Sequence, residues 1–283
     1  MQPTELKFTV DGREFAAQAW GNPEHLPVLA LHGWLDNSAS FFALAPLLKK
    51  VYLVALDMAG HGQSSHRPGT FPYNIWEDVA EIFAIADQLG WNRFALLGHS
   101  RGAIIATLAA GTFPQRITHL GLIEGILPEP ARSEDSPKQL ALSIKASQSQ
   151  QVKPLTIYSD YASAIAVRER GMFPLSHAAA KALTERGLRK VEQGYQWSTD
   201  RRLLIPSSLK LLPEQMAAFI ACITCPIALV LAEDGMPKLF PNYVEAVKSY
   251  TRVAVTTLPG RHHLHMEPEA DKVASVLNPF FQK

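Results

Sequence analysis

The chain has 283 residues, of which 47% are apolar, and a formal net charge of +1. This length allows one large core with an insertion, and the balanced charge favours neither nucleic acid nor a membrane surface as a partner. No apolar window reaches the roughly 18 residues of a spanning helix, and residues 1–15 lack a basic segment followed by an apolar one. We therefore expect a cytoplasmic protein.

The N-terminal segments predict an antiparallel edge. Residues 4–10 and 13–20 alternate or run apolar on either side of Asp11-Gly12, a strong two-residue hairpin signal. A short apolar run over 28–31 follows as a further strand. Residues 40–49 are then predicted to form a helix.

Apolar strands and helices alternate in the next part of the chain. Strands are predicted at 51–57, 94–97 and 117–125, and one helix begins after Asn74, with Glu77 completing a capping box. Strands without polar alternation are typical of a sheet buried on both faces. We therefore predict an α/β fold with a mostly parallel sheet between helices.

This alternation stops between residues 127 and 213. The segment is polar, interrupted by proline and helix-favouring, and it contains no apolar strand. The strand pattern resumes at 226–235 and 252–260, and a final helix is expected over 269–281. We therefore predict an inserted helical cap at 127–213, with the core formed by 1–126 and 214–283.

The strongest chemical signal is the strand, sharp turn and helix around Gly98-His99-Ser100-Arg101-Gly102. A serine at the apex of such a turn needs strained backbone angles and small neighbours, which Gly98 and Gly102 supply. The turn exposes the hydroxyl at the end of a buried strand. We therefore predict that Ser100 is a nucleophile, which requires a general base and an acid that orients it.

Three histidines are candidates for the base. His262, His263 and His265 all follow the last predicted strand, and groups at the carboxyl ends of parallel strands meet at one edge of the sheet. Residue types alone leave this choice open.

The two cysteines, Cys222 and Cys225, form one C-x-x-C pair without a second pair. We interpret them as two buried thiols instead of a metal or redox site, and expect neither metal nor cofactor.

Four motifs together resemble the α/β-hydrolase superfamily over nearly the whole chain. They are His32-Gly33-Trp34, Asp57-x-x-Gly60-His61-Gly62-x-Ser64, the GHSRG turn and the terminal GRHHLHMEP. The resemblance implies an eight-stranded sheet, places the base at His262, and makes Asp57, His61 and Ser64 a structural turn. Among members with serine at the turn, the chain resembles the serine hydrolase-like proteins.

The position of the acid departs from the commonest pattern of that superfamily. Similar enzymes carry G-x-x-D after the seventh strand, where this chain has Gly235 at the acid position and Asp234 one residue early. A minority of the superfamily takes the acid from the end of the sixth strand, which corresponds to Glu124. We prefer Glu124 and keep Asp234 as the alternative.

The backbone N–H groups of Arg101 and, by resemblance, Trp34 are the predicted oxyanion donors. The Arg101 side chain opposes the helix dipole. It is expected to pair with a nearby acid, or alternatively to bind a substrate carboxylate.

These features predict a serine hydrolase that cleaves a carboxylic ester or related acyl compound through an acyl-enzyme. Amide or carbon–carbon bond hydrolysis and acyl transfer use the same groups, and a small-molecule binding protein with slow or no turnover is the rival outside enzymes. Candidate substrate-binding residues are Trp34, Phe41, Phe42, Arg101, Met172 and Trp197.

Overall fold

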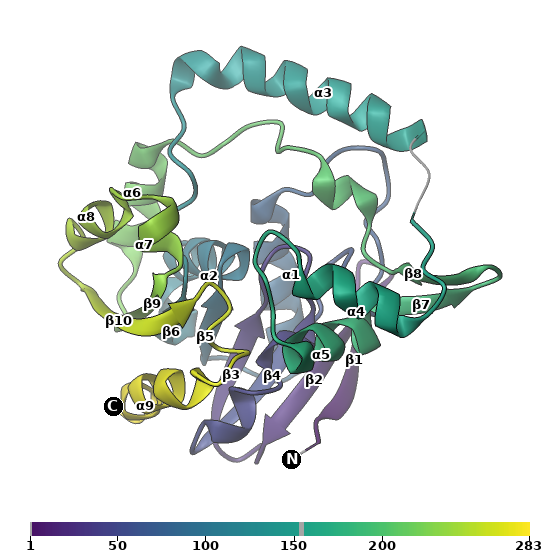
Figure 1. The fold of residues 1–283 in the computed structure, drawn as a ribbon. Helices are drawn as coiled ribbons and strands as arrows, with labels where there is room; N and C mark the ends of the chain where they lie inside the picture. The colour runs from purple at the N-terminus through teal and green to yellow at the C-terminus, as the bar shows by residue number, and fades with distance from the viewer. Residues whose placement is uncertain (1, 153–155) are drawn as a thin grey trace.

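The computed structural model describes residues 2–152 and 156–283. Its main sheet has eight strands in the order β1-β2-β4-β3-β5-β6-β9-β10 (Figure 1). β1–β2 and β2–β4 pair antiparallel, and the other neighbours pair parallel, which confirms the predicted fold class. The strands are β1 (Thr4–Val10), β2 (Arg13–Gly21), β3 (Leu26–Leu31), β4 (Val51–Leu56), β5 (Phe94–His99), β6 (Ile117–Ile123), β9 (Ile227–Asp234) and β10 (Val253–Arg261).

Helices cover both faces of this sheet. One face buries residues from α1 (Ile75–Gln88), α2 (Arg101–Thr112), α6 (Pro213–Cys222) and α8 (Tyr243–Lys248). The opposite face packs against α9 (Ala270–Phe281). α1 starts as predicted, because the Asn74 backbone N–H donates to Glu77 at 3.1 Å in a capping box.

The helix predicted over 40–49 is wrong. Two short 3-10 turns, η1 (Ser38–Phe41) and η2 (Ala45–Leu47), take its place. Pro46 lies in the second turn and supplies no backbone N–H, so a continuous helix would lose a hydrogen bond there. Phe41 and Leu44 are fully buried in the core beneath these turns.

The segment between β6 and α6 lies over the edge of the sheet at which the parallel strands end (Figure 1). It holds α3 (Ser136–Val152), α4 (Tyr161–Glu169), α5 (His177–Gly187) and the 3-10 turn η5 (Arg201–Leu204). Hydrogen bonds join it to the core loops, including Asp200 N–H to the Gly60 carbonyl and the Trp34 indole to the Leu203 carbonyl. This segment therefore covers the carboxyl ends of the parallel strands.

Among its described residues the segment contains no apolar strand, as expected, but a short and partly exposed hairpin interrupts its helices. β7 (Leu188–Val191) and β8 (Gly194–Trp197) form an antiparallel hairpin directly after α5. Trp197 packs onto the end of α5, where a Cβ on Gly187 would lie 2.7 Å from its ring. Tertiary packing thus outweighs the local preference of this stretch for helix.

The expectation of two buried thiols is also wrong. Cys222 is exposed at the end of α6, and Cys225 is only partly covered. Among the described residues, no helix is long and apolar enough to cross a bilayer.

Candidate active site

Ser100 lies in a strained turn between β5 and α2, with φ 51° and ψ −116°. The turn is tightly packed, because a Cβ on Gly98 would lie 2.5 Å from the Ala103 Cα and one on Gly102 would lie 2.2 Å from the Leu31 carbonyl oxygen. Both glycines are therefore required. The turn presents the serine hydroxyl at the carboxyl end of the sheet.

The Ser100 hydroxyl faces one histidine and, through it, one carboxylate. His262 Nε2 lies 3.0 Å from Ser100 Oγ, and His262 Nδ1 lies 2.9 Å from Glu124 Oε2. Glu124 is fully buried and His262 nearly so. A histidine that donates to a carboxylate through Nδ1 leaves Nε2 free to accept the serine proton.

Backbone donors fix the Glu124 carboxylate in this position. Oε1 accepts from the Ala232 N–H at 2.6 Å, and Oε2 accepts from the Met236 N–H at 2.7 Å. Glu124 also has a positive φ of 55°, which turns the chain sharply after β6. The carboxylate is thus aimed at His262 by its strand end and by the β9–α7 turn, where α7 is Met236–Leu239.

Known proteins are similar to this chain in sequence and in fold. A family model described as the alpha/beta hydrolase fold matches residues 27–155. Serine hydrolase-like protein 2 of Homo sapiens is 31% identical over 99% of this chain and 94% of its own length. The chain belongs to the α/β-hydrolase superfamily. This membership confirms the predicted resemblance, including that to the serine hydrolase-like proteins.

Two solved structures each match this chain over 99% of its length and 99% of their own length. A hypothetical protein from Pseudomonas aeruginosa PAO1 has a TM-score of 0.94 and 41% identity. A thioesterase domain from the curacin biosynthetic pathway has a TM-score of 0.84 and 27% identity.

Asp234, the alternative acid, lies away from His262 in this α/β-hydrolase. Its side chain is exposed and pairs with Lys238 at 2.8 Å. Gly235, at the commonest acid position, has a different role: a Cβ there would lie 2.0 Å from Glu124 Oε2. The missing side chain at 235 therefore makes the space that the Glu124 carboxylate fills.

A buried polar group behind His262 was missed by the sequence interpretation. Asp36 accepts from His263 Nε2 at 3.2 Å and from Arg168 of α4 at 2.5 Å, and His99 Nε2 lies 2.9 Å from the His262 carbonyl oxygen. Burial alone would raise the pKa of Asp36, but His263 and Arg168 outweigh it and hold that pKa well below its usual range. The only sequence signal was the closeness of His99 and His263 to Ser100 and His262.

Asp36, His99 and His263 also carry the donor types that a transition metal binds. Their ligand atoms lie within 4.8 Å of one another, and all three residues are buried. The Asp36 charge is already balanced by the Arg168 guanidinium.

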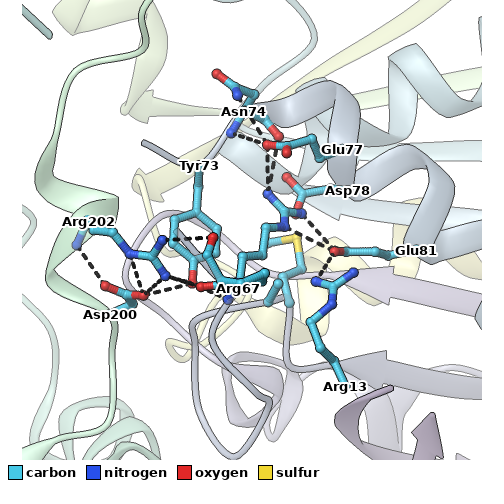
Figure 2. Close-up of polar contacts among 12 residues, drawn as sticks. Arg13, Arg67, Tyr73, Asn74, Glu77, Asp78, Glu81, Asp200 and Arg202 are labelled. Carbon is cyan, nitrogen blue, oxygen red and sulfur yellow. Dashed lines mark hydrogen bonds and ion pairs between the residues drawn. The ribbon is translucent and has the colours of Figure 1, made fainter. Parts of the chain in front are cut away.

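The Arg101 side chain belongs to an ion-pair network. Its guanidinium donates to Asp78 Oδ2 at 2.8 Å, and Arg67 donates to the other Asp78 oxygen at 2.8 Å. Figure 2 shows Arg67 reaching both Asp78 and Glu81, with Arg13 on the far side of Glu81. Each of the three arginines in this network has at least one carboxylate partner, with Glu77 as a further partner of Arg67 and Asp11 as a further partner of Arg13. Asp78 is therefore the acidic partner that the pairing hypothesis for Arg101 requires.

The proposed substrate-binding side chains lie in different places. Trp34 and Met172 line a cavity of about 220 Å³ that also contains Ser100 and His262. Trp197 lines a neighbouring cavity of about 280 Å³, and Arg101 lines a third of about 550 Å³. Phe41 does not fit its predicted role, because it is fully buried beside His265 in the core. Phe42 packs with a second buried cluster under α5.

Phe173 was not foreseen from the sequence. Its ring stacks on the His262 ring, with centroids 4.3 Å apart, and it lines the cavity at Ser100. An apolar ring in this position restricts the movement of the imidazole and keeps water away from one of its faces.

The turn after β4 is held together by hydrogen bonds. Asp57 accepts from the Ser38 N–H, the Gln63 N–H and Arg186, and Ser64 donates to the Asp57 carbonyl. His61 packs edge-on against His32. These contacts hold the loop next to Trp34.

Proposed function

We propose that this α/β-hydrolase cleaves a carboxylic ester or related acyl compound through an acyl-enzyme on Ser100. The observation that carries the proposal is the position of His262, with one ring nitrogen within hydrogen-bond distance of Ser100 Oγ and the other within that distance of Glu124. A hydroxyl becomes nucleophilic when a held imidazole can take its proton.

The reaction has two halves. Ser100 Oγ attacks the acyl carbonyl carbon while its proton passes to His262 Nε2, and His262 then gives that proton to the leaving oxygen or sulfur as the bond to the acyl group breaks. Water then attacks the acyl-enzyme carbonyl carbon while His262 takes a proton from it, and His262 returns that proton to Ser100 Oγ as the bond to the acyl group breaks and the acid is released. Glu124 stabilises the imidazolium in both halves.

Two backbone N–H groups are proposed to bind the oxyanion. Arg101 is the first residue of α2, and its N–H has no acceptor within the helix. Trp34 follows β3 in the loop beside Ser100 and lines the same cavity. Such donors, fixed before the reaction begins, typically account for about 10² to 10³ in kcat each.

The thioesterase domain similar to this chain supports an acyl substrate. We therefore include thioesters among the candidate substrates. Amide and carbon–carbon bond hydrolysis remain the second proposal, because the same three side chains serve them.

Burst kinetics with p-nitrophenyl esters test the proposal. An acyl-enzyme predicts a burst of p-nitrophenol stoichiometric with enzyme, followed by slower turnover. Ser100→Ala should abolish both phases and leave the unfolding temperature nearly unchanged. Turnover that survives in Ser100→Ala would contradict the proposal, as would a folded wild type that hydrolyses neither ester nor thioester.

A further inference from the structure

The cavity of about 550 Å³ lies next to the nucleophile but does not include it. Arg101, directly after Ser100, and Ile104, one turn further along α2, form part of its wall. Trp34 lines both this cavity and the one that holds Ser100. The two cavities therefore share Trp34 as a wall residue, and we call this position their junction.

Proton transfer decides which part of a substrate lies in which space. The leaving group must receive its proton from His262 Nε2, so it belongs in the cavity lined by His262, His263 and Phe173. If the acyl carbonyl oxygen binds the proposed donors, the N–H groups of Arg101 and Trp34, the acyl chain extends away from His262 on the side of Trp34.

The wall of the larger cavity is apolar. Most of its side chains are aliphatic or aromatic, among them Trp34, Ile75, Trp76, Ile104, Leu209 and Leu211. Its charged groups are already paired: Arg101 with Asp78 at 2.8 Å, and Lys210 with Glu129 at 2.6 Å. An apolar chain would lose no hydrogen bond here, whereas a charged one would find no free counter-ion among the described lining residues.

Trp34 is held at the junction of the two cavities. Its indole N–H donates to the Leu203 carbonyl at 2.8 Å, which ties it to η5. Leu203 also lines the larger cavity. The wall at this position therefore has two parts that are hydrogen-bonded to each other. One is the loop that carries Trp34, and the other is η5 of the covering segment.

We propose that the cavity bounded by Trp34, Ile104 and Leu211 binds the apolar acyl chain of the substrate. The inference rests on the proposed function and specifies its substrate class as esters or thioesters of medium- or long-chain apolar acids. Each methylene group of the acyl chain that is buried in this cavity favours longer substrates over shorter ones.

Acyl-chain series in wild type and in Ile104→Trp test this assignment. For p-nitrophenyl acetate, butyrate, octanoate and decanoate, kcat/KM should rise up to about fourfold per methylene, which corresponds to ~0.8 kcal/mol each. Ile104→Trp fills the cavity, so the preference for decanoate over acetate should fall at least tenfold. Val167→Trp, an exposed α4 position on the neighbouring cavity, is the matched control and should leave that preference unchanged.

Binding to Ser100→Ala separates this inference from the proposed function. Calorimetry with butanoate, octanoate and decanoate should show Kd falling with chain length, and Ile104→Trp should remove that trend, even if the wild type proves to have no turnover. Affinity independent of chain length would overturn the assignment, as would a trend lost in Val167→Trp and kept in Ile104→Trp.

Discussion

At the scale of single residues, the acid is the most informative position. Glu124 and Asp234 follow neighbouring strands, and the sequence offered both. Gly235 distinguishes them, because the space it leaves is filled by the Glu124 carboxylate. The glycine at 235, where the commonest family pattern has the acid, is therefore explained by the Glu124 side chain. Glu124 lies more than a hundred residues earlier in the sequence.

Glu124→Gln should lower kcat/KM by about 10⁴, because an amide that donates to His262 favours the wrong tautomer. Asp234→Asn is the matched control and should stay within about twofold, since its carboxylate is exposed and pairs with Lys238 at the surface. Steady-state kinetics on a p-nitrophenyl ester, with unfolding curves for both variants, measure this. A large loss in Asp234→Asn with an active Glu124→Gln would reverse the assignment.

Arg101→Leu should lower the free energy of unfolding and leave substrate specificity nearly unchanged. Asp78 is buried and would keep only Arg67 as a partner, so the free energy of unfolding should fall by about 1–3 kcal/mol. The ratio of kcat/KM for an ester with an anionic acyl group to that for a neutral one should change less than about twofold. A selective loss of anionic substrates would instead identify Arg101 as a substrate ligand.

At the scale of elements, sequence patterns missed the hairpin and the 3-10 turns η1, η2 and η5. Leu188–Val191 lies in a stretch of helix-favouring residues, yet it pairs with Gly194–Trp197 because Trp197 packs on the end of α5. Such contacts between elements leave no periodic signal. The core strands were predictable because burial on both faces leaves them mostly apolar.

Arg202→Met tests how η5 is held on the core. Arg202 donates to Asp200, to the Tyr73 hydroxyl and to the Arg67 carbonyl (Figure 2). It also donates to the Gly69 carbonyl. Losing these contacts should cost about 1–3 kcal/mol and speed proteolysis near η5. Lys210→Met, which removes an exposed ion pair, should cost less than about 1 kcal/mol. Equal stability losses in the two variants would contradict a holding role for Arg202.

At the scale of the whole molecule, buried histidines link stability to pH. Burial lowers the pKa of His32, His61, His99 and His265. The unfolded chain, with histidine near about 6.5, binds more protons, so this stabilisation is complete above that pH and is lost as the pH falls below it.

The free energy of unfolding should therefore decrease from pH 7 to pH 5, by about 1.4 kcal/mol per pH unit for each extra proton bound on unfolding. His265→Phe should flatten the dependence, and His25→Gln, at an exposed position, should not. Urea unfolding across this range measures the slope. A slope unchanged in His265→Phe would show that other groups cause it.

Much of the site was predictable because strand ends and tight turns mark it in the sequence. Ser100 and Glu124 follow the buried strands β5 and β6, His262 follows the edge strand β10, and parallel strands bring their carboxyl ends together. Arg168 and Phe173 were not predictable, because they come from the covering segment and reach the site only through its packing. Phe41 was assigned to the cavity since aromatic residue type does not distinguish lining from core.

The central claim is that Ser100 is a nucleophile activated by His262 and Glu124, and fluorophosphonate labelling tests it most directly. The wild type should gain one phosphonyl group, located on Ser100 by peptide mass spectrometry, and Glu124→Gln should label far more slowly. Folded wild-type protein that stays unlabelled, or carries the label on another residue, would contradict the account.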